Sequence, residues 1–152
     1  MSIEKNTKKS QEIVARLKQS YKDKDLIATG DTVNSIRSEA TDSGFKILGA
    51  SWIELTETGR GPRKSNKESD FLARLEKWRK ARGVETPART LQYLINKYGT
   101  NLHQGKDDRF KGTRSNVITD VINDELIAEL RGEFFGQYAA KLRTDLKRIM
   151  TL

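Results

Sequence analysis

The sequence predicts an α+β protein in which a small antiparallel β-sheet packs with an N-terminal helix, two short middle helices and a long C-terminal helix. Three observations predict this class: apolar residues at helical spacing near both ends, a hairpin pattern over residues 34–50, and two short helical patterns between them. The length of 152 residues fits one domain with a modest core. We therefore expect a single domain over residues 1–152.

The first helix is expected over residues 3–21, because Ile13, Leu17 and Tyr21 recur at helical spacing. Its opening turns carry lysines and lack apolar anchors, which favours fraying. A turn at Gly30 follows. Two short strands, residues 35–40 and 45–50, then flank Thr-Asp-Ser-Gly, a composition typical of a hairpin turn.

The first middle helix is expected from Asp70, with an apolar face that ends in Trp78, and we interpret Trp78 as a core residue. Gly83 stands where a C-terminal cap belongs. The second begins after Thr86-Pro87, with Thr86 as the capping hydroxyl, and ends at Gly99. The apolar face of this second helix consists of Leu91, Leu94, Ile95 and Tyr98. Residues 60–69 and 100–115 are expected to be exposed loops, the second either an interaction loop or poorly ordered.

The final helix carries the strongest periodic signal. From Ile118 onward, apolar residues fall every four positions, and Asn116 is the candidate cap. Gly132 and Gly136 interrupt the pattern, each at a cost of roughly 1 kcal/mol relative to alanine. Two interpretations stay open: a tolerated bend or break in the helix, or the close approach of a neighbouring element.

The composition is polar for an isolated globular protein, with 35% hydrophobic and 33% charged residues. A helical subunit covered by neighbours, or one lying along nucleic acid, can carry such a surface. Cysteine is absent, which excludes disulfides and thiolate metal sites. No apolar run approaches the ~20 residues that span a bilayer, and no signal peptide is visible, so we expect no membrane association.

Most of the net charge of +8 lies in residues 60–82, which hold nine basic and three acidic side chains. Such a segment is usually a solvated helix face and a charged loop, but it also suits a polyanion or an acidic partner. Both interpretations have equal weight from the sequence. The candidate polyanion contacts, which would position DNA without reading its sequence, are Arg63, Lys64, Lys67, Arg74, Lys77 and Lys80.

No catalytic constellation is apparent, so we expect a protein that is not an enzyme and that needs no cofactor or metal. His103 is the single histidine and has no cysteine beside it to share a zinc ion. Adjacent Asp107 and Asp108 usually only solvate a loop. Glu54 and Glu57 lie one turn apart near the basic segment, but further acidic partners of a nuclease site are missing.

Three motifs, in this order, resemble the family of small minor tail and tail-completion proteins of tailed bacteriophages. Residues 29–36 resemble its Thr-Gly-x-Leu-x-x-Ser-Ile stretch, although Thr32 stands where leucine is usual. Trp52 followed by Glu-Thr-Gly-Arg-Gly-Pro at residues 57–62 resembles its Glu-x-Gly-x-Gly-Pro motif after a hairpin. Residues 78–84 resemble the end of its short helix. The likeness covers residues 20–100.

The resemblance implies a structural virion protein that assembles as a six-fold or twelve-fold ring at the head–tail joint. Its partners would be the portal or adaptor and tail proteins, with sequence-independent contact to packaged DNA, after synthesis in the host cytoplasm. The resemblance also implies that the subunit interface or lumen contains Trp52, Glu57, Gly59, Arg60, Gly61 and Pro62. Substitution of Glu57 or Gly59 would then impair particle completion and leave monomer folding largely intact. The alternatives are a small basic nucleic-acid-binding protein that uses residues 60–82, and a phage nuclease or toxin.

Overall fold

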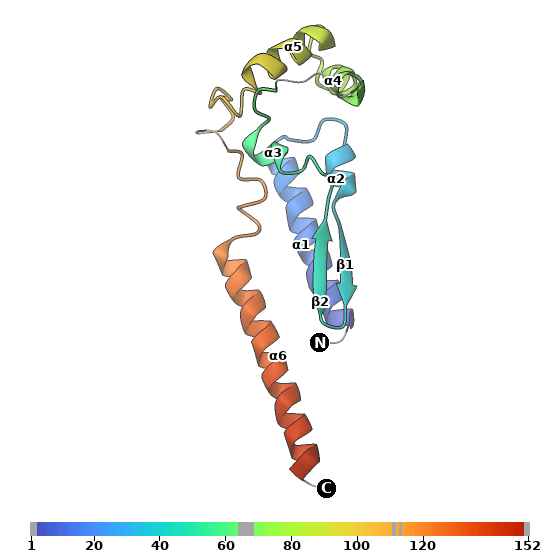
Figure 1. Cartoon of the computed structure of the whole chain (residues 1–152), viewed down its shortest axis with the longest axis vertical. Helices are drawn as coiled ribbons and strands as arrows, with labels where there is room; N and C mark the ends of the chain where they lie inside the picture. The colour runs from blue at the N-terminus through green and yellow to red at the C-terminus, as the bar shows by residue number, and fades with distance from the viewer. Residues whose placement is uncertain (1–2, 64–68, 111, 113, 151–152) are drawn as a thin grey trace.

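The computed structural model describes residues 3–63, 69–110, 112 and 114–150. Along this described chain the elements are α1 (Ile3–Asp23), α2 (Asp31–Ser35), β1 (Arg37–Thr41), β2 (Gly44–Leu48), α3 (Leu55–Thr58), α4 (Ser69–Arg82), α5 (Ala88–Tyr98) and α6 (Asp124–Met150). The predicted α+β class, with its two-stranded antiparallel sheet and its N-terminal, middle and C-terminal helices, is confirmed (Figure 1).

The hairpin packs along α1. Its strands pair antiparallel from Arg37 opposite Leu48 to Thr41 opposite Gly44, around a two-residue turn. The opening turns of α1 are held by polar side chains and not by apolar ones: Asn6 and Ser10 are fully buried. Asn6 Nδ2 donates to the Thr41 carbonyl over 2.6 Å, and the Ser10 hydroxyl donates to that of Ser38 over 3.0 Å. These turns lack apolar anchors, as expected, but buried polar side chains tie them to the hairpin in place of the expected fraying.

The core forms where α1, the hairpin and the start of α6 meet. Its buried residues come from α1, from Ile36 before the hairpin, and from the segment that leads into α6: Ile13, Leu17, Tyr21, Ile36, Val117 and Leu126. Phe45 and Ile47 of the hairpin pack against this set, as does Leu130. The apolar periodicity of α1 therefore predicted its buried face correctly.

Helices α4 and α5 pack on each other at the end of the molecule that is away from the hairpin tip (Figure 1). Leu75 is buried, but Trp78 is 39% exposed, so the expectation of a core Trp78 is wrong. The predicted Thr86 cap is also wrong: α5 follows Pro87, and no side chain caps the helix. Gly83 and Gly99 do end their helices with positive φ.

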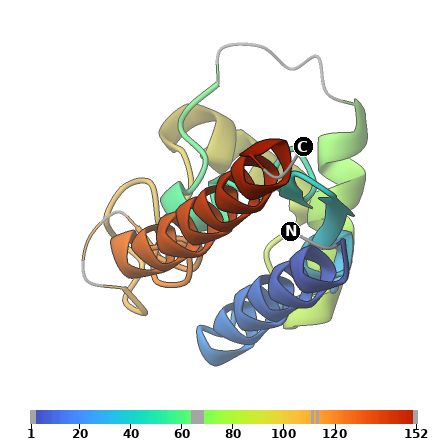
Figure 2. The same ribbon diagram turned by 90° about the horizontal axis from the view of Figure 1, so that it is seen from below.

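Helix α6 begins at Asp124, seven residues after the position that follows the predicted Asn116 cap. Asn116 has φ 54°, and residues 117–123 form turns before Asn123 Oδ1 accepts a hydrogen bond from the Leu126 amide over 3.0 Å. From there α6 is continuous through Gly132 and Gly136, so the helix tolerates both glycines without a break, and no described element approaches either glycine closely. Helix α6 runs antiparallel to α1, and its second half extends past the hairpin tip (Figures 1 and 2).

The two expected loops are only partly exposed. Residues 61–63 are described without helix or strand, and residues 64–68 lie outside the described residues. In the segment 100–115, Leu102 and Ser115 are buried, so part of this connection belongs to the interior.

Candidate functional site

Trp52, the first of the predicted interface residues, is held within its own chain. Its indole Nε1 donates to the Thr32 hydroxyl over 3.1 Å. The Arg74 guanidinium lies 5.1 Å from the centre of the Trp52 ring, a distance at which the cation and the ring attract each other. Trp52 therefore joins α2 to α4 within the chain.

Glu57 is buried by the chain's own residues and is 8% exposed. Its carboxylate accepts hydrogen bonds from the Thr119 hydroxyl and, over 3.2 Å, from the Thr119 amide. Its carbonyl accepts from the Ser115 amide over 2.7 Å. Glu57 thus fastens α3 to the segment 115–119, and a substitution that leaves monomer folding intact is no longer expected.

The end of α1 is tied into the same contact. The hydroxyl of fully buried Tyr21 is hydrogen-bonded to that of Thr56 over 2.5 Å, and burial raises the pKa of the Tyr21 hydroxyl. The Ser115 hydroxyl donates to the Thr56 carbonyl over 2.8 Å, and Ser20 donates to the Val117 carbonyl over 2.9 Å. We call this set of contacts between α1, α3 and residues 115–119 the junction.

The Gly-Arg-Gly stretch makes a close backbone contact. Gly59 has φ 73°, and a Cβ there would lie 2.5 Å from the His103 amide nitrogen. At Gly61 a Cβ would lie 3.2 Å from the His103 ring. The Arg60 carbonyl accepts from the Thr100 amide over 2.8 Å. The glycines therefore allow this stretch to lie against residues 99–103.

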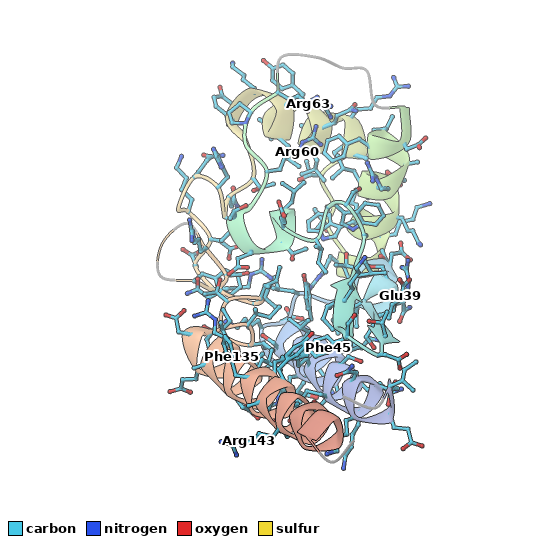
Figure 3. All side chains as sticks on the ribbon, turned by 60° about the horizontal axis from the view of Figure 1, so that its bottom comes forward. Glu39, Phe45, Arg60, Arg63, Phe135 and Arg143 are labelled. Carbon is cyan, nitrogen blue, oxygen red and sulfur yellow. The ribbon has the colours of Figure 1, made fainter. Side chains whose placement is uncertain are left out.

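Arg60 is also engaged inside the subunit: its guanidinium lies 3.8 Å from the centre of the Phe71 ring. Pro62 and Arg63 are exposed, and the Arg63 amide donates to the Asn96 carbonyl over 2.8 Å. Figure 3 shows Arg60 and Arg63 beside the α4–α5 pair. Among the six residues predicted for the interface, Pro62 is the one with an exposed side chain.

The basic residues of α4 pair with acidic residues of the same chain. Lys77 lies 2.7 Å from Asp31, and Arg82 lies 2.7 Å from Asp25. Lys80 lies 3.8 Å from Glu76. The hydrogen bond from Lys77 holds the pKa of Asp31 below its usual range. Lys64 and Lys67 lie outside the described residues, so their predicted polyanion contacts have no structural description.

Two exposed apolar surfaces correct the expected apolar faces, because Leu94 and Tyr98 of the predicted face on the second middle helix are exposed. On α5, Tyr93 is 60% exposed, Leu94 41% and Tyr98 49%; we call these three residues the α5 surface. On α6, Phe135 is 72% and Tyr138 63% exposed; with Gly132 and Gly136 they form the α6 surface. The periodicity of both helices was visible, but it did not tell which apolar residues face the core.

The described residues offer few means for chemistry. None of their histidine, aspartate and glutamate side chains form a group of three that could hold a metal ion. An open groove of about 400 Å³ lies between α1 and the segment that leads into α6, and its lining includes Arg16, Asp120 and Glu125. None of the helices searched within the described part of the chain is long and apolar enough to cross a membrane.

Comparison with known proteins gives no relative: no family model, no curated protein and no solved structure matches the chain. The contacts brace the Gly-Pro segment internally, and the most exposed large apolar side chains of the described residues lie on α5 and α6.

Replacement of Glu57 by alanine should lower the free energy of unfolding by about 1–2 kcal/mol, because two hydrogen bonds to a carboxylate are lost. The Thr119 side chain is exposed and can hydrogen-bond to water in the variant, which keeps the loss of stability small. Urea denaturation measures it. The control is Glu54→Ala, an exposed glutamate one turn earlier, with a change within about 0.5 kcal/mol. Equal stability of the two variants would contradict the role of Glu57.

The Gly59→Ala variant should lose more stability than Gly83→Ala. Both glycines have positive φ, but a Cβ at Gly59 collides with the His103 backbone and the Thr100 hydroxyl, whereas one at Gly83 meets nothing within 4 Å. The backbone conformation alone costs about 1–2 kcal/mol for a residue with a Cβ, and the collision adds to it at Gly59. Thermal denaturation compares the two variants, and a larger loss for Gly83→Ala would contradict the contact with His103.

The pKa of Asp31 should rise toward its usual value of 3.8 in the Lys77→Met variant. A carboxyl whose pKa is lowered on folding stabilises the fold above its unfolded pKa and loses this contribution as the pH falls through the folded pKa. The contribution from the Asp31–Lys77 pair should therefore be present at neutral pH and vanish below pH 3.8. Titration followed by NMR measures the pKa of Asp31 in both proteins. Lys80→Met, on the same helix but paired with Glu76, should leave the titration of Asp31 unchanged.

Proposed function

We propose that the chain is a structural virion protein of a tailed bacteriophage, a ring-forming subunit at the head–tail joint, and not an enzyme. The observation that carries the proposal is the pair of exposed apolar surfaces on α5 and α6. They lie toward opposite ends of the molecule (Figure 1). A head-to-tail contact joins two different surfaces of neighbouring copies and closes into a ring when the rotation permits.

The order of the motifs supports the same proposal. The Thr-Gly stretch, the Glu-x-Gly-x-Gly-Pro stretch and the helix that ends after Trp78 occur in the order that the resemblance to tail-completion proteins requires. Because Glu57 and Gly59 contact residues of the same chain, the second motif would stabilise the fold of the proposed subunit. Direct contact with a neighbour would then fall to exposed side chains.

In this proposal the subunit forms a six-fold or twelve-fold ring in the neck of the particle. Its neighbours are the portal or adaptor on one side and the tail proteins on the other. Packaged DNA passes through the ring, and exposed Arg63 is a candidate contact for its phosphates.

Two observations weigh against a free nucleic-acid-binding protein. Lys77 and Arg82 are paired with carboxylates, and Arg60 and Arg74 lie over aromatic rings, so the charge of these four residues already has partners within the chain. DNA contact is for this reason a secondary part of the proposed role.

Mass spectrometry of purified phage particles should detect the chain in a fixed number of copies, and electron microscopy should locate it as a ring between head and tail. A phage that lacks the gene should accumulate heads and tails that are not joined. Absence of the chain from purified particles would overturn the proposal, as would normal particles made without it.

A further inference from the structure

The exposed side of α5 is basic and aromatic along its length. Its exposed residues form two neighbouring stripes at a spacing of four residues: Arg89, Tyr93 and Lys97 in one, and Thr90, Leu94 and Tyr98 in the other. The helix contains no acidic residue, and the acidic residues nearest to it in the sequence, Glu85 and Asp107, lie outside it. The first stripe therefore presents two cations on one side of the helix.

Lys97 lies between two phenol groups. Its ammonium is 5.6 Å from the centre of the Tyr93 ring and 5.0 Å from that of Tyr98. Hydrogen bonds to the Tyr98 and Tyr93 hydroxyls raise the pKa of the Lys97 ammonium, so it is charged at neutral pH. A lysine only donates, which leaves the hydrogen of each phenol free to bind another acceptor. One ammonium and two hydroxyls therefore gather where they can bind an anionic oxygen together.

The charge of this stripe is not neutralised within the described part of the chain. No carboxylate of the described residues forms an ion pair with Arg89 or Lys97. The cations of α4 differ, because Lys77 pairs with Asp31 and Arg82 pairs with Asp25. An external anion would therefore be attracted more strongly by the stripe on α5 than by these two residues of α4.

The spacing of the two cations suits a repeating anion. Arg89 and Lys97 lie eight positions apart on one helix, which separates them by about 12 Å along its axis. The same length of a DNA duplex carries about three phosphates on each strand. The two cations can therefore contact separate phosphates. Threonine and tyrosine hydroxyls, which this side of α5 also exposes, are common phosphate donors.

We propose that Arg89, Lys97 and the hydroxyls of Tyr93 and Tyr98 bind the phosphate backbone of DNA without reading its sequence. The net charge of +8 adds a long-range attraction for a polyanion. Leu94 lies in the other stripe and stays available to a neighbouring copy in the proposed ring. The choice of DNA as the polyanion rests on the proposed function, in which packaged DNA passes through that ring.

Fluorescence anisotropy of labelled DNA duplexes with the purified full chain tests the site. Two unrelated sequences should bind equally, and the affinity should fall as the salt concentration rises. The variant Arg89→Gln/Lys97→Gln should make the slope of log affinity against log salt concentration shallower by about 1.8, because two phosphate contacts are lost. Absence of binding at low salt would overturn the proposal.

The matched control is Lys5→Gln/Lys8→Gln. It removes the same charge from exposed lysines of α1 at the other end of the molecule (Figure 1). This variant should keep the slope of the unmodified chain. An equal change of slope in both double variants would show that the positive charge acts without a site on α5, and would overturn the proposal.

The hydroxyls are tested by Tyr93→Phe/Tyr98→Phe, which keeps both rings. Loss of two neutral donors should weaken DNA binding by about tenfold and leave the salt slope unchanged, since no charge is removed. Unchanged affinity would contradict the role of the hydroxyls in the site.

Two competitors distinguish DNA from other anions. Inorganic phosphate, at the same concentration of phosphate groups as the duplex, should not displace the DNA. Poly-glutamate should bind more weakly than DNA. Displacement by inorganic phosphate would indicate a site for a single anion. Tighter binding of poly-glutamate that depends on Arg89 and Lys97 would assign the surface to an acidic protein. Either result would overturn the proposal.

The outcomes separate this site from the proposed function. DNA binding that depends on Arg89 and Lys97, by a chain that is absent from purified phage, would keep the site and end the virion role. A chain that is present in the neck but whose DNA binding does not depend on these residues would keep the role and end the site.

Discussion

The hydrogen-bonded junction between α1, α3 and residues 115–119 is the constraint on which the rest of the structure depends. Lys24 Nζ donates to the Ser115 carbonyl over 2.8 Å, and Ser115 in turn donates to Thr56 and Glu57. This polar set lies directly beside Val117, which is fully buried in the core. The junction therefore fixes the point from which the chain runs into α6.

Buried polar contacts of this kind select one geometry, because each donor and acceptor must find its partner. An apolar contact in the same place would tolerate slippage. The direction of α6 then follows from the junction and from the few apolar residues at the start of the helix. Its later turns extend beyond the hairpin (Figure 1). The junction thus sets the direction in which α6 extends beyond the rest of the chain.

The sequence predicted the elements that carry their own periodic signal. Helix α1 and the hairpin were found because apolar spacing and a short turn specify them locally. The start of α6 was misplaced because Val117, Ile118 and Val121 keep the helical spacing while they pack on the core as turns. Periodicity reports which residues are apolar, and the backbone between them is decided by tertiary contacts.

The candidate site was harder to predict for the same reason. Nothing local distinguishes Glu57, whose partner Thr119 lies 62 positions away, from exposed Glu54. The close contact of Gly59 and Gly61 with residues 99–103 was not predicted, because Gly99 is distant in the sequence and was interpreted only as a helix end. The exposure of Trp78, Tyr93 and Phe135 depends on which side of each helix the remainder of the chain covers. That choice could not be predicted from the apolar spacing of each helix alone.

The attachment of the α4–α5 pair has a mechanical consequence. Helices α4 and α5 contribute none of the residues described in the main core, and Lys77 and Arg82 tether α4 to Asp31 and Asp25 at the surface. Ionic tethers exposed to water can break and re-form without opening apolar surface. The α4–α5 pair can therefore shift on the body without opening the apolar core that α1, the hairpin and α6 share. If the chain forms the proposed ring, this compliance would be present in every copy, and the ring could seat against two structures whose diameters do not match.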